Sequence, residues 1–357
     1  MAAEADLHAA ASTLVTKGRN AVKRIVVLAL AAAFAVPAGA QTVLKVHSFS
    51  SPQAPDQALH LFPWAEKVNQ ASGGKLKIEV YTSMQLGGKP ADLPQQLEDG
   101  VVDAIFHLPG FSPGRFPAME GTELPFTNVG VSAGQSPAVF EWANRWLKDS
   151  EFKGIRVLAI HATDASILHT RERAIRTLED FKGVKLRVPG RFVGEAAKAL
   201  GATPVGIPLP GVYEALSRGQ VDGMFINWAI MPSYRFHEVT KNHMETPVYQ
   251  SPLMTLMSER SYAKLPADLR KAIDDNSGLE YTKHIGKVWD GLTEGARKQT
   301  RDAGNNVYSL SVQERARWAE AVRPVYKIWV DEMNKRGLAG QKMLDDLLAT
   351  TAKYGRK

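Results

Sequence analysis

The pattern of apolar and polar positions divides the chain into three parts. Residues 25–36 form one uninterrupted apolar stretch. Over residues 43–250, short apolar or alternating segments are separated by turn signals and by segments with helical spacing. From residue 266 onward, apolar residues recur at helical spacing only. The pattern therefore predicts strands alternating with helices in the middle of the chain, and helices alone in its last part.

The middle part carries enough strand signals for two sheets. Strands are expected at residues 43–47, 75–81, 101–108, 154–162, 167–170, 185–188 and 224–227. Helices are expected at residues 56–71, 90–99, 191–200 and 213–218, and then at 266–303, 312–334 and 338–354. Strands and helices that alternate in this way form mostly parallel sheets covered by helices. The predicted fold class is α/β, with two lobes that each contain one such sheet.

The segment 181–228 holds the strongest candidate for a binding residue. Residues 184–188 (VKLRV) alternate apolar and basic side chains, and Pro189-Gly190 then ends the predicted strand. Arg187 therefore lies at the carboxyl end of a strand, where open α/β sheets bind ligands. Its planar guanidinium can form two parallel hydrogen bonds with a carboxylate. The segment predicts a carboxylate site, although a salt-bridged surface arginine is the simpler alternative.

The motifs that surround Arg187 recur in one protein family. They are GVKLRVP at 183–189, LGATPV at 200–205, VYEAL at 212–216 and VDG at 221–223. Earlier landmarks are YTSMQLGG at 81–88, LEDGVVD at 97–103, FP at 116–117 and LPF at 124–126. In this order and spacing they resemble the substrate-binding proteins of tripartite ATP-independent periplasmic (TRAP) transporters, the DctP-like family. The resemblance covers nearly all of the chain after residue 40.

This resemblance implies a fold, a partner and a function. The fold is expected to be the two-lobed fold of periplasmic binding proteins, with a long C-terminal helical spine. Lobe I is expected at residues 41–164 plus about 251–290, lobe II at 165–250 plus about 312–357, and an inter-lobe helical connection at about 290–311. The implied function is a receptor that closes over an organic acid and delivers it to the membrane subunits of a TRAP permease, driven by an ion gradient.

The first 40 residues read as a cleaved signal peptide. Lys23 and Arg24 precede the apolar stretch at 25–36, and Ala38-Gly39-Ala40 provides a small-x-small cleavage site before Gln41. The apolar stretch is too short to span a bilayer comfortably. We therefore expect export to the periplasm, with cleavage after Ala40.

Composition narrows the classes of partner and cofactor. The formal net charge is +7, and the basic residues are scattered without a Lys/Arg run, so a nucleic-acid partner is not expected. The chain has no cysteine, which excludes disulfides and thiolate chemistry. No nucleotide-binding or metal-binding motif is present, so no cofactor and no metal are expected. A monomer is the expected state.

An enzyme that uses the same cleft is the alternative from another class. Residues 110–114 (GFSPG) match the G-x-S-x-G pattern of a hydrolase nucleophile. In that elbow the residue after the serine donates its backbone N–H to the oxyanion, and Pro113 has none. We therefore expect a loop over the cleft and no catalytic residue. The receptor of an ATP-driven transporter is a second alternative, which only the order of the TRAP motifs disfavours.

The residues expected around Arg187 predict the class of ligand. Strand ends that should face the cleft carry mainly apolar side chains. The candidate binding residues are Arg187, Asn227, Trp228, His107, Phe106, Leu108, Leu209 and Ile226. Arg187 is expected to anchor one carboxylate, and Asn227 or His107 to hold a 2-hydroxy or 2-oxo group if the ligand has one.

Three departures from the family pattern bear on the ligand. Members that bind sugar acids or dicarboxylates usually carry further polar groups at positions that correspond here to Leu108, Ile167 and Ile226, which are all apolar. A second charged end would be buried there without a partner. An apolar or aromatic monocarboxylate is therefore expected. The alternatives are a dicarboxylate or sugar-acid receptor of the same family, with these side chains only packing the sheet cores and loops supplying the polar contacts.

Overall fold

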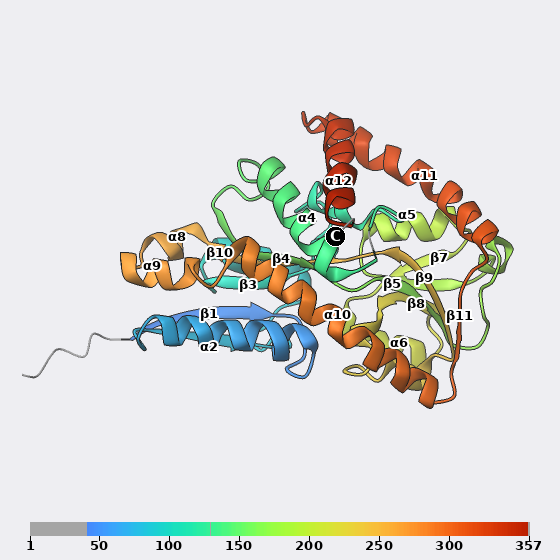
Figure 1. Ribbon diagram of the computed structural model, residues 1–357, viewed down its shortest axis with the longest axis horizontal. Helices are drawn as coiled ribbons and strands as arrows, with labels where there is room; N and C mark the ends of the chain where they lie inside the picture. The colour runs from blue at the N-terminus through green and yellow to red at the C-terminus, as the bar shows by residue number, and fades with distance from the viewer. Residues whose placement is uncertain (1–40, 129, 356–357) are drawn as a thin grey trace, which may run out of the picture. The chain divides into compact units, whose positions relative to one another are not determined.

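Residues 41–128 and 130–355, which the computed structural model describes, contain two β-sheets flanked by helices (Figure 1). The first sheet has the strand order β2-β1-β3-β10-β4, and the second has the order β11-β9-β5-β8-β6-β7. The strands of the first sheet are β1 (Thr42–Ser48), β2 (Leu76–Tyr81), β3 (Ala104–His107), β4 (Ile155–Ala162) and β10 (Pro252–Ser258). Those of the second are β5 (Ser166–Thr170), β6 (Lys185–Val188), β7 (Thr203–Gly206), β8 (Gly223–Asn227), β9 (Asn242–Tyr249) and β11 (Asn306–Tyr308). The signal peptide predicted at residues 1–40 lies outside the described residues.

Both sheets are mixed, because one strand in each runs against its neighbours. β10 is antiparallel to β3 and to β4, and β5 is antiparallel to β8 and to β9. The pairs β1 and β3, β6 and β7, β6 and β8, and β9 and β11 are parallel. Each reversed strand follows a strand of the other sheet without a helix in between, whereas helical crossovers return the chain in the same direction. The expectation of mostly parallel sheets is corrected at these two strands.

The chain passes between the sheets at two short connections that are hydrogen-bonded to each other. The first joins β4 to β5 through Thr163, and the second joins β9 to β10 through Gln250 and Ser251. The Thr163 amide donates to the Ser251 carbonyl at 3.0 Å, and Gln250 Nε2 donates to the Thr163 carbonyl at 2.6 Å. These bonds satisfy buried polar groups and hold the two connections side by side.

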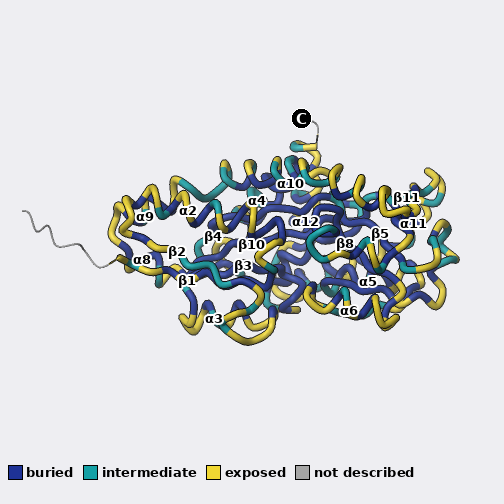
Figure 2. Tube along the Cα trace, turned by 90° about the horizontal axis from the view of Figure 1, so that it is seen from below, coloured by how far each residue is buried: buried dark blue, intermediate teal, exposed yellow. Residues whose placement is uncertain are grey.

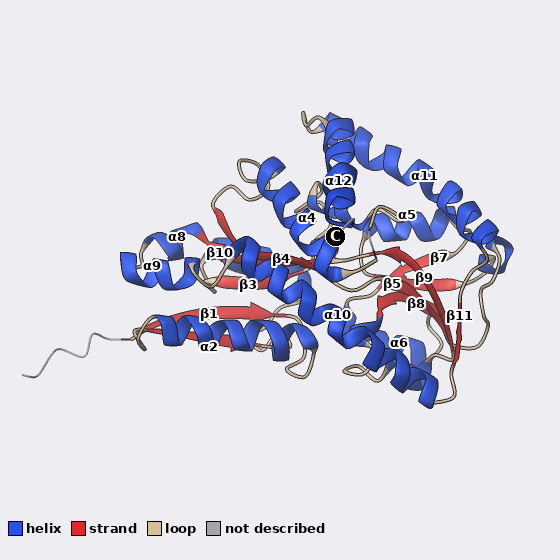
Figure 3. Cartoon of the chain, viewed as in Figure 1, coloured by secondary structure: helices blue, strands red, loops and turns tan. Residues whose placement is uncertain are grey.

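Helices cover the faces of both sheets (Figure 3). They are α2 (Phe62–Ala71), α3 (Leu93–Asp99), α4 (Ser132–Trp146), α5 (Arg191–Ala199), α6 (Val212–Ser217), α7 (Phe236–Val239), α8 (Glu259–Ala263), α9 (Ala267–Asp274), α10 (Gly278–Asp302), α11 (Val312–Lys335) and α12 (Gly340–Gly355). The interior strands of both sheets are largely buried, whereas the outer faces of the helices are exposed (Figure 2). No helix within residues 41–128 and 130–355 is long and apolar enough to cross a membrane.

The long helix α10 contacts elements of both sheets. It packs on α4 and β4 of the first sheet, and on the helical turn Trp228–Ile230 that follows β8 of the second. Asp290, in the middle of α10, accepts hydrogen bonds from the backbone amides of Ser132 and Ala133, at 2.6 and 2.8 Å. These are the first amides of α4, which lack helical partners. The structure thus confirms the helical spine predicted for the C-terminal part.

Four strands were not predicted from the sequence. Pro204 interrupts the pattern of β7, which lies at the edge of its sheet, where a missing N–H is tolerated. β9 (NHMETPVY) lacks a clean alternation, and β10 (PLMTLMS) is rich in Leu and Met, which favour helices as much as strands. The fourth, β11, falls within the stretch expected to form the helical connection at about 290–311.

Candidate functional site

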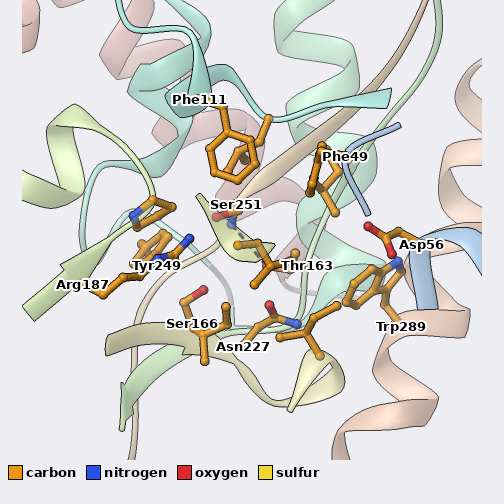
Figure 4. Close-up of a pocket in the computed structure, with 16 residues that line it drawn as sticks. Phe49, Asp56, Phe111, Thr163, Ser166, Arg187, Asn227, Tyr249, Ser251 and Trp289 are labelled. Carbon is orange, nitrogen blue, oxygen red and sulfur yellow. Dashed lines mark hydrogen bonds between the residues drawn. The ribbon is translucent and has the colours of Figure 1, made fainter. Parts of the chain in front are cut away.

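A cavity lies where strand ends of the two sheets meet the two connections. Figure 4 shows it with the residues that line it. These are Phe49, Asp56, Leu108, Phe111, Thr163, Ser166, Arg187, Pro189, Leu209, Ile226, Asn227, Ile230, Tyr249, Ser251, Leu253 and Trp289. They come from both sheets, both connections and α10, so the cavity is a site that the whole fold builds.

Arg187 is held at one end of the cavity by the carboxyl end of β6 (Figure 4). Parallel pairing sets Arg187 opposite Val205 of β7 and Met224 of β8, so β6 is an interior strand of its sheet. Its Nε donates to the Ile207 carbonyl at 2.8 Å, and its Nη1 donates to the Phe225 carbonyl at 3.3 Å. Two bonds to backbone fix the plane of the guanidinium before any ligand arrives.

The charge of Arg187 has no ionised partner among the described residues. Arg187 is only 2% exposed, and it forms no salt bridge within residues 41–128 and 130–355. Burial lowers the pKa of Arg187 to about 10, with Tyr249 and Glu123 opposing the shift, so the guanidinium stays charged at neutral pH. Burial also raises the pKa of the nearby Glu123 to about 8, so that carboxyl is mostly neutral. The site therefore presents an uncompensated positive charge that favours an anion.

Apolar and aromatic side chains form the walls between the two ends of the cavity. Phe49 and Phe111 meet edge to face, with ring centroids 4.9 Å apart. Leu209 and Ile226 add aliphatic surface, and Trp289 of α10 adds a third aromatic ring. Walls of this kind stabilise a ring by burial and by offset contacts of about 0.5–1.5 kcal/mol.

Asn227 presents a fixed amide to the cavity. Its Nδ2 donates to the buried carboxylate of Asp164, which also accepts from Thr293 Oγ1 at 3.1 Å and from the Ala229 amide at 3.2 Å. Because a carboxylate only accepts, it orients the Asn227 Nδ2 toward itself and leaves Oδ1 directed into the cavity (Figure 4). Asn227 can therefore accept a hydrogen bond from a ligand.

The structure brings five of the eight predicted binding residues into the cavity lining and leaves three outside it. The five are Arg187, Leu108, Leu209, Ile226 and Asn227. Phe106 lies one layer behind, where its ring stacks on Phe49 at 5.6 Å. His107 points to the other face of β3, as alternation along a strand requires.

Neither His107 nor Trp228 faces the cavity as predicted. His107 is fully buried beside Phe116, and burial together with the charge of Arg115 lowers its pKa to about 3. Trp228 is turned into the second sheet, where its ring packs on His169, with centroids 5.2 Å apart, and on His243. The aromatic wall expected from Trp228 is supplied by Trp289.

Sequence reasoning missed the residues that reach the cavity from helices and connections. Asp56 is the first residue of a π-helical turn, and Trp289 lies within α10. Tyr249 ends β9, and Ser251 belongs to the second connection. Only Phe111 carried a signal, because it belongs to the segment 110–114 that was expected to be a loop over the cleft. The others come near Arg187 through the topology, which no local pattern records.

The pattern at 110–114 forms no nucleophile. Ser112 donates its hydroxyl to the Ala91 carbonyl at 2.8 Å and does not line the cavity. No group of three or more potential metal ligands occurs within residues 41–128 and 130–355. The arrangement therefore offers binding groups, and no pair of side chains in the lining is arranged as a nucleophile and its base.

Comparison with known proteins identifies the family. Residues 48–333 match the family model described as bacterial extracellular solute-binding protein, family 7. One relative is the C4-dicarboxylate-binding periplasmic protein DctP of Rhodobacter capsulatus, 28% identical over 91% of this chain and 96% of that protein.

Two solved structures are more similar in sequence. One is a TRAP solute binding protein specific for aromatic acid ligands, from an unidentified marine microbe, in complex with metahydroxyphenylacetate. It has a TM-score of 0.84 and 39% identity, covering 88% of this chain and 99% of that one. The other is a TRAP solute binding protein from Rhodoferax ferrireducens T118 in complex with copurified benzoate, with a TM-score of 0.85, 37% identity and the same coverage. The chain belongs to the bacterial extracellular solute-binding protein family 7 and is the solute receptor of a TRAP transporter.

Proposed function

We propose that this receptor binds an aromatic or otherwise apolar monocarboxylate. The observation that carries the proposal is the buried guanidinium of Arg187, which has no ionised partner among the described residues, at one end of a cavity with aromatic walls. A carboxylate can form two parallel hydrogen bonds with a guanidinium whose position is already fixed. The ring of the ligand then lies among Phe49, Phe111 and Trp289.

Charge in the lining argues against a dicarboxylate. Arg187 is the one cationic side chain among the described residues that line the cavity, and an acidic residue, Asp56, lies at the other end. A second carboxylate would lose its hydration there and meet a like charge. The C4-dicarboxylate-binding relative is only 28% identical, whereas the relatives that hold aromatic acids are 37–39% identical. The charge of the lining and the sequence identities of the relatives both support an aromatic acid as the ligand.

Binding and delivery, without turnover, is the proposed activity. The relatives are solute-binding proteins, and members of the family are periplasmic and work with a TRAP permease. We infer that this chain is exported by a signal peptide that is cleaved after Ala40, acts as a monomer, and hands its ligand to such a permease. A 2-hydroxy or 2-oxo group on the acid would lie within reach of Asn227 if it stands next to the carboxylate.

Calorimetry on ligand-free, exported protein tests the proposal. Benzoate, phenylacetate and mandelate should bind at least about tenfold more tightly than succinate and malate, because only the monocarboxylates leave no charge without a partner. Mandelate against phenylacetate reports on the 2-hydroxy group. Tighter binding of either C4-dicarboxylate would overturn the ligand class.

A further inference from the structure

Asp56 is a buried carboxylate in the cavity that carboxylate binding by Arg187 leaves unused. It begins the π-helical turn Asp56–Leu61 that leads into α2, and it is only 2% exposed. Figure 4 shows it beside the indole of Trp289, at the end of the cavity remote from Arg187. A π-helical turn is a rare local structure that is often found at functional sites.

One oxygen of Asp56 has no hydrogen-bond partner among the described residues. Its Oδ2 accepts from the Ser50 hydroxyl, whereas the buried Oδ1 accepts from no group in residues 41–128 and 130–355. Two neighbouring donors, Gln57 Nε2 and the Ser51 amide, are engaged elsewhere. Gln57 Nε2 donates to Ser48 Oγ at 2.6 Å, and the Ser51 amide donates to the Tyr234 hydroxyl at 3.3 Å. A buried acceptor without a partner is costly, so it marks a place for a donor that a ligand brings.

The ionisation state of Asp56 suits an acceptor. Burial raises its pKa to about 6, while the hydrogen bond from Ser50 and the backbone amides of Asp56 and Gln57 oppose the shift. Tyr234, which adjoins Asp56 from the segment after β8, carries no charge, because burial raises its pKa to about 12. Asp56 forms no salt bridge among the described residues. At neutral pH it is mostly ionised, and ionised carboxylates form the stronger hydrogen bonds.

We propose that Asp56 accepts a hydrogen bond from a hydroxyl group on the ligand's ring, at the end opposite the carboxylate that Arg187 binds. The ligand class is then a ring-hydroxylated aromatic monocarboxylate. This inference rests on the proposed function, because it needs the carboxylate at Arg187 to place the ring. It assigns Asp56 as a specificity-determining residue, since a ring without a donor leaves the Asp56 Oδ1 buried and unpaired.

Binding of matched ligands to the wild-type protein gives the first test. The probes are phenylacetate, its 2-, 3- and 4-hydroxy derivatives, and the methyl ethers of these three phenols. At least one phenol should bind about tenfold or more tightly than phenylacetate, and its methyl ether, which cannot donate, should lose that advantage. Equal binding of all phenols and phenylacetate, or an ether as tight as its phenol, would overturn the role of Asp56.

Variants of Asp56 test whether the preference for a phenol arises at this residue. In Asp56→Ala the advantage of the preferred phenol over phenylacetate, both measured on the variant, should shrink to about threefold or less. In Asp56→Asn, which keeps a weaker acceptor, the advantage of the phenol should lie between those of the wild type and Asp56→Ala. The matched control is Glu123→Gln, which removes a buried carboxyl that does not line the cavity and should leave the phenol to phenylacetate ratio unchanged.

The two proposals fail in different ways. If phenylacetate binds but no phenol gains, or if the gain survives in Asp56→Ala, only the assignment of Asp56 is wrong. If none of these acids binds while a C4-dicarboxylate does, the proposed function falls and the assignment of Asp56 falls with it. Should Asp56→Ala not fold, the phenols and their ethers still decide the question on the wild-type protein.

Discussion

The backbones of Gly110 and Gly190 approach each other closely, and each glycine adjoins a residue of the cavity lining, Phe111 or Pro189. A Cβ atom added to Gly110 would lie 2.8 Å from the Cα of Gly190, and one added to Gly190 would lie 2.9 Å from the Cα of Gly110. Gly110 follows β3 of the first sheet, and Gly190 follows β6 of the second, three residues after Arg187. Only glycine permits this approach, so the contact fixes how closely the two sheets' binding segments come together.

We expect Gly190→Ala to weaken ligand binding by about tenfold or more. Its Cβ would press on backbone, which cannot move aside as a flexible side chain does, so the segment that carries Arg187 must shift. The control is Gly206→Ala at the end of β7, where an added Cβ would have no atom within 4 Å. Dissociation constants from calorimetry check the pair, and equal affinities for both variants would show that the contact does not matter for binding.

Arg187→Ala should abolish binding of the acid and leave the protein folded. The loss should be at least about 3 kcal/mol, or more than a hundredfold in the dissociation constant, because the ligand's carboxylate would be left buried without a partner. Arg187→Lys should also bind weakly, since an ammonium cannot match the planar fork. Arg218→Ala, at an exposed ion pair with Glu214, serves as the control. Near-normal affinity in a folded Arg187→Ala protein would remove Arg187 from the site.

The sequence allowed Arg187 to be placed at a strand end that lines the cavity, because its signals are local. An alternating strand, a Pro-Gly stop and a helix start all lie within a few residues of it, and strand ends follow a general rule of α/β folds. Leu108, Ile226 and Asn227 were placed by the same rule. The two sheets and the C-terminal helices were predictable for the same reason, since they depend on periodicity within single segments.

Asp56 and Trp289 could not be found in this way. Asp56 opens a helical turn and Trp289 lies on a long helix, so each fits an ordinary structural role in its own segment. Their positions in the cavity depend on the path of the chain between the sheets, which includes the unpredicted strands β9 and β10. His107 lies on the opposite face of β3 from Phe106, because successive residues of a strand alternate between faces. Trp228 begins the helical turn that follows β8, where the strand-end rule no longer sets the direction of a side chain.

Asp164→Asn should destabilise the protein by about 1–3 kcal/mol. Asp164 accepts hydrogen bonds from Asn227, Ala229 and Thr293, and so ties the end of β8 and α10 to the first connection. An asparagine amide replaces one acceptor oxygen with a donor, which would face donor groups in a buried place. Urea unfolding checks the change, with Asp99→Asn on the exposed end of α3 as the control. An unchanged midpoint for Asp164→Asn would contradict this role.

The stability of the ligand-free protein should depend on pH through Glu123. Burial is the main cause that raises the pKa of Glu123 from 4.5 to about 8. The negative charge of Glu120 adds to the shift, while the hydrogen bond from Ser251 and the charge of Arg187 oppose it. Tyr249, which also faces Glu123, stays neutral because burial raises its pKa. The folded state therefore keeps a proton that the unfolded state releases.

The direction of this pH dependence follows from whether Glu123 holds its proton in the folded state and in the unfolded state. Below about pH 4.5 Glu123 is protonated in both states, and between about pH 4.5 and pH 8 only the folded state holds the proton. Raising the pH through this window lowers the free energy of unfolding by up to about 1.4 kcal/mol per pH unit, and the loss levels off above about pH 8.

Glu123→Gln removes this one contribution and can keep a hydrogen bond with Ser251. Its stability relative to wild type should therefore rise from pH 5 to pH 8. Other buried acids titrate in both proteins. The quantity to measure is therefore the unfolding free energy of wild type minus that of Glu123→Gln at each pH. A difference that stays constant would place the pKa of Glu123 near its ordinary value.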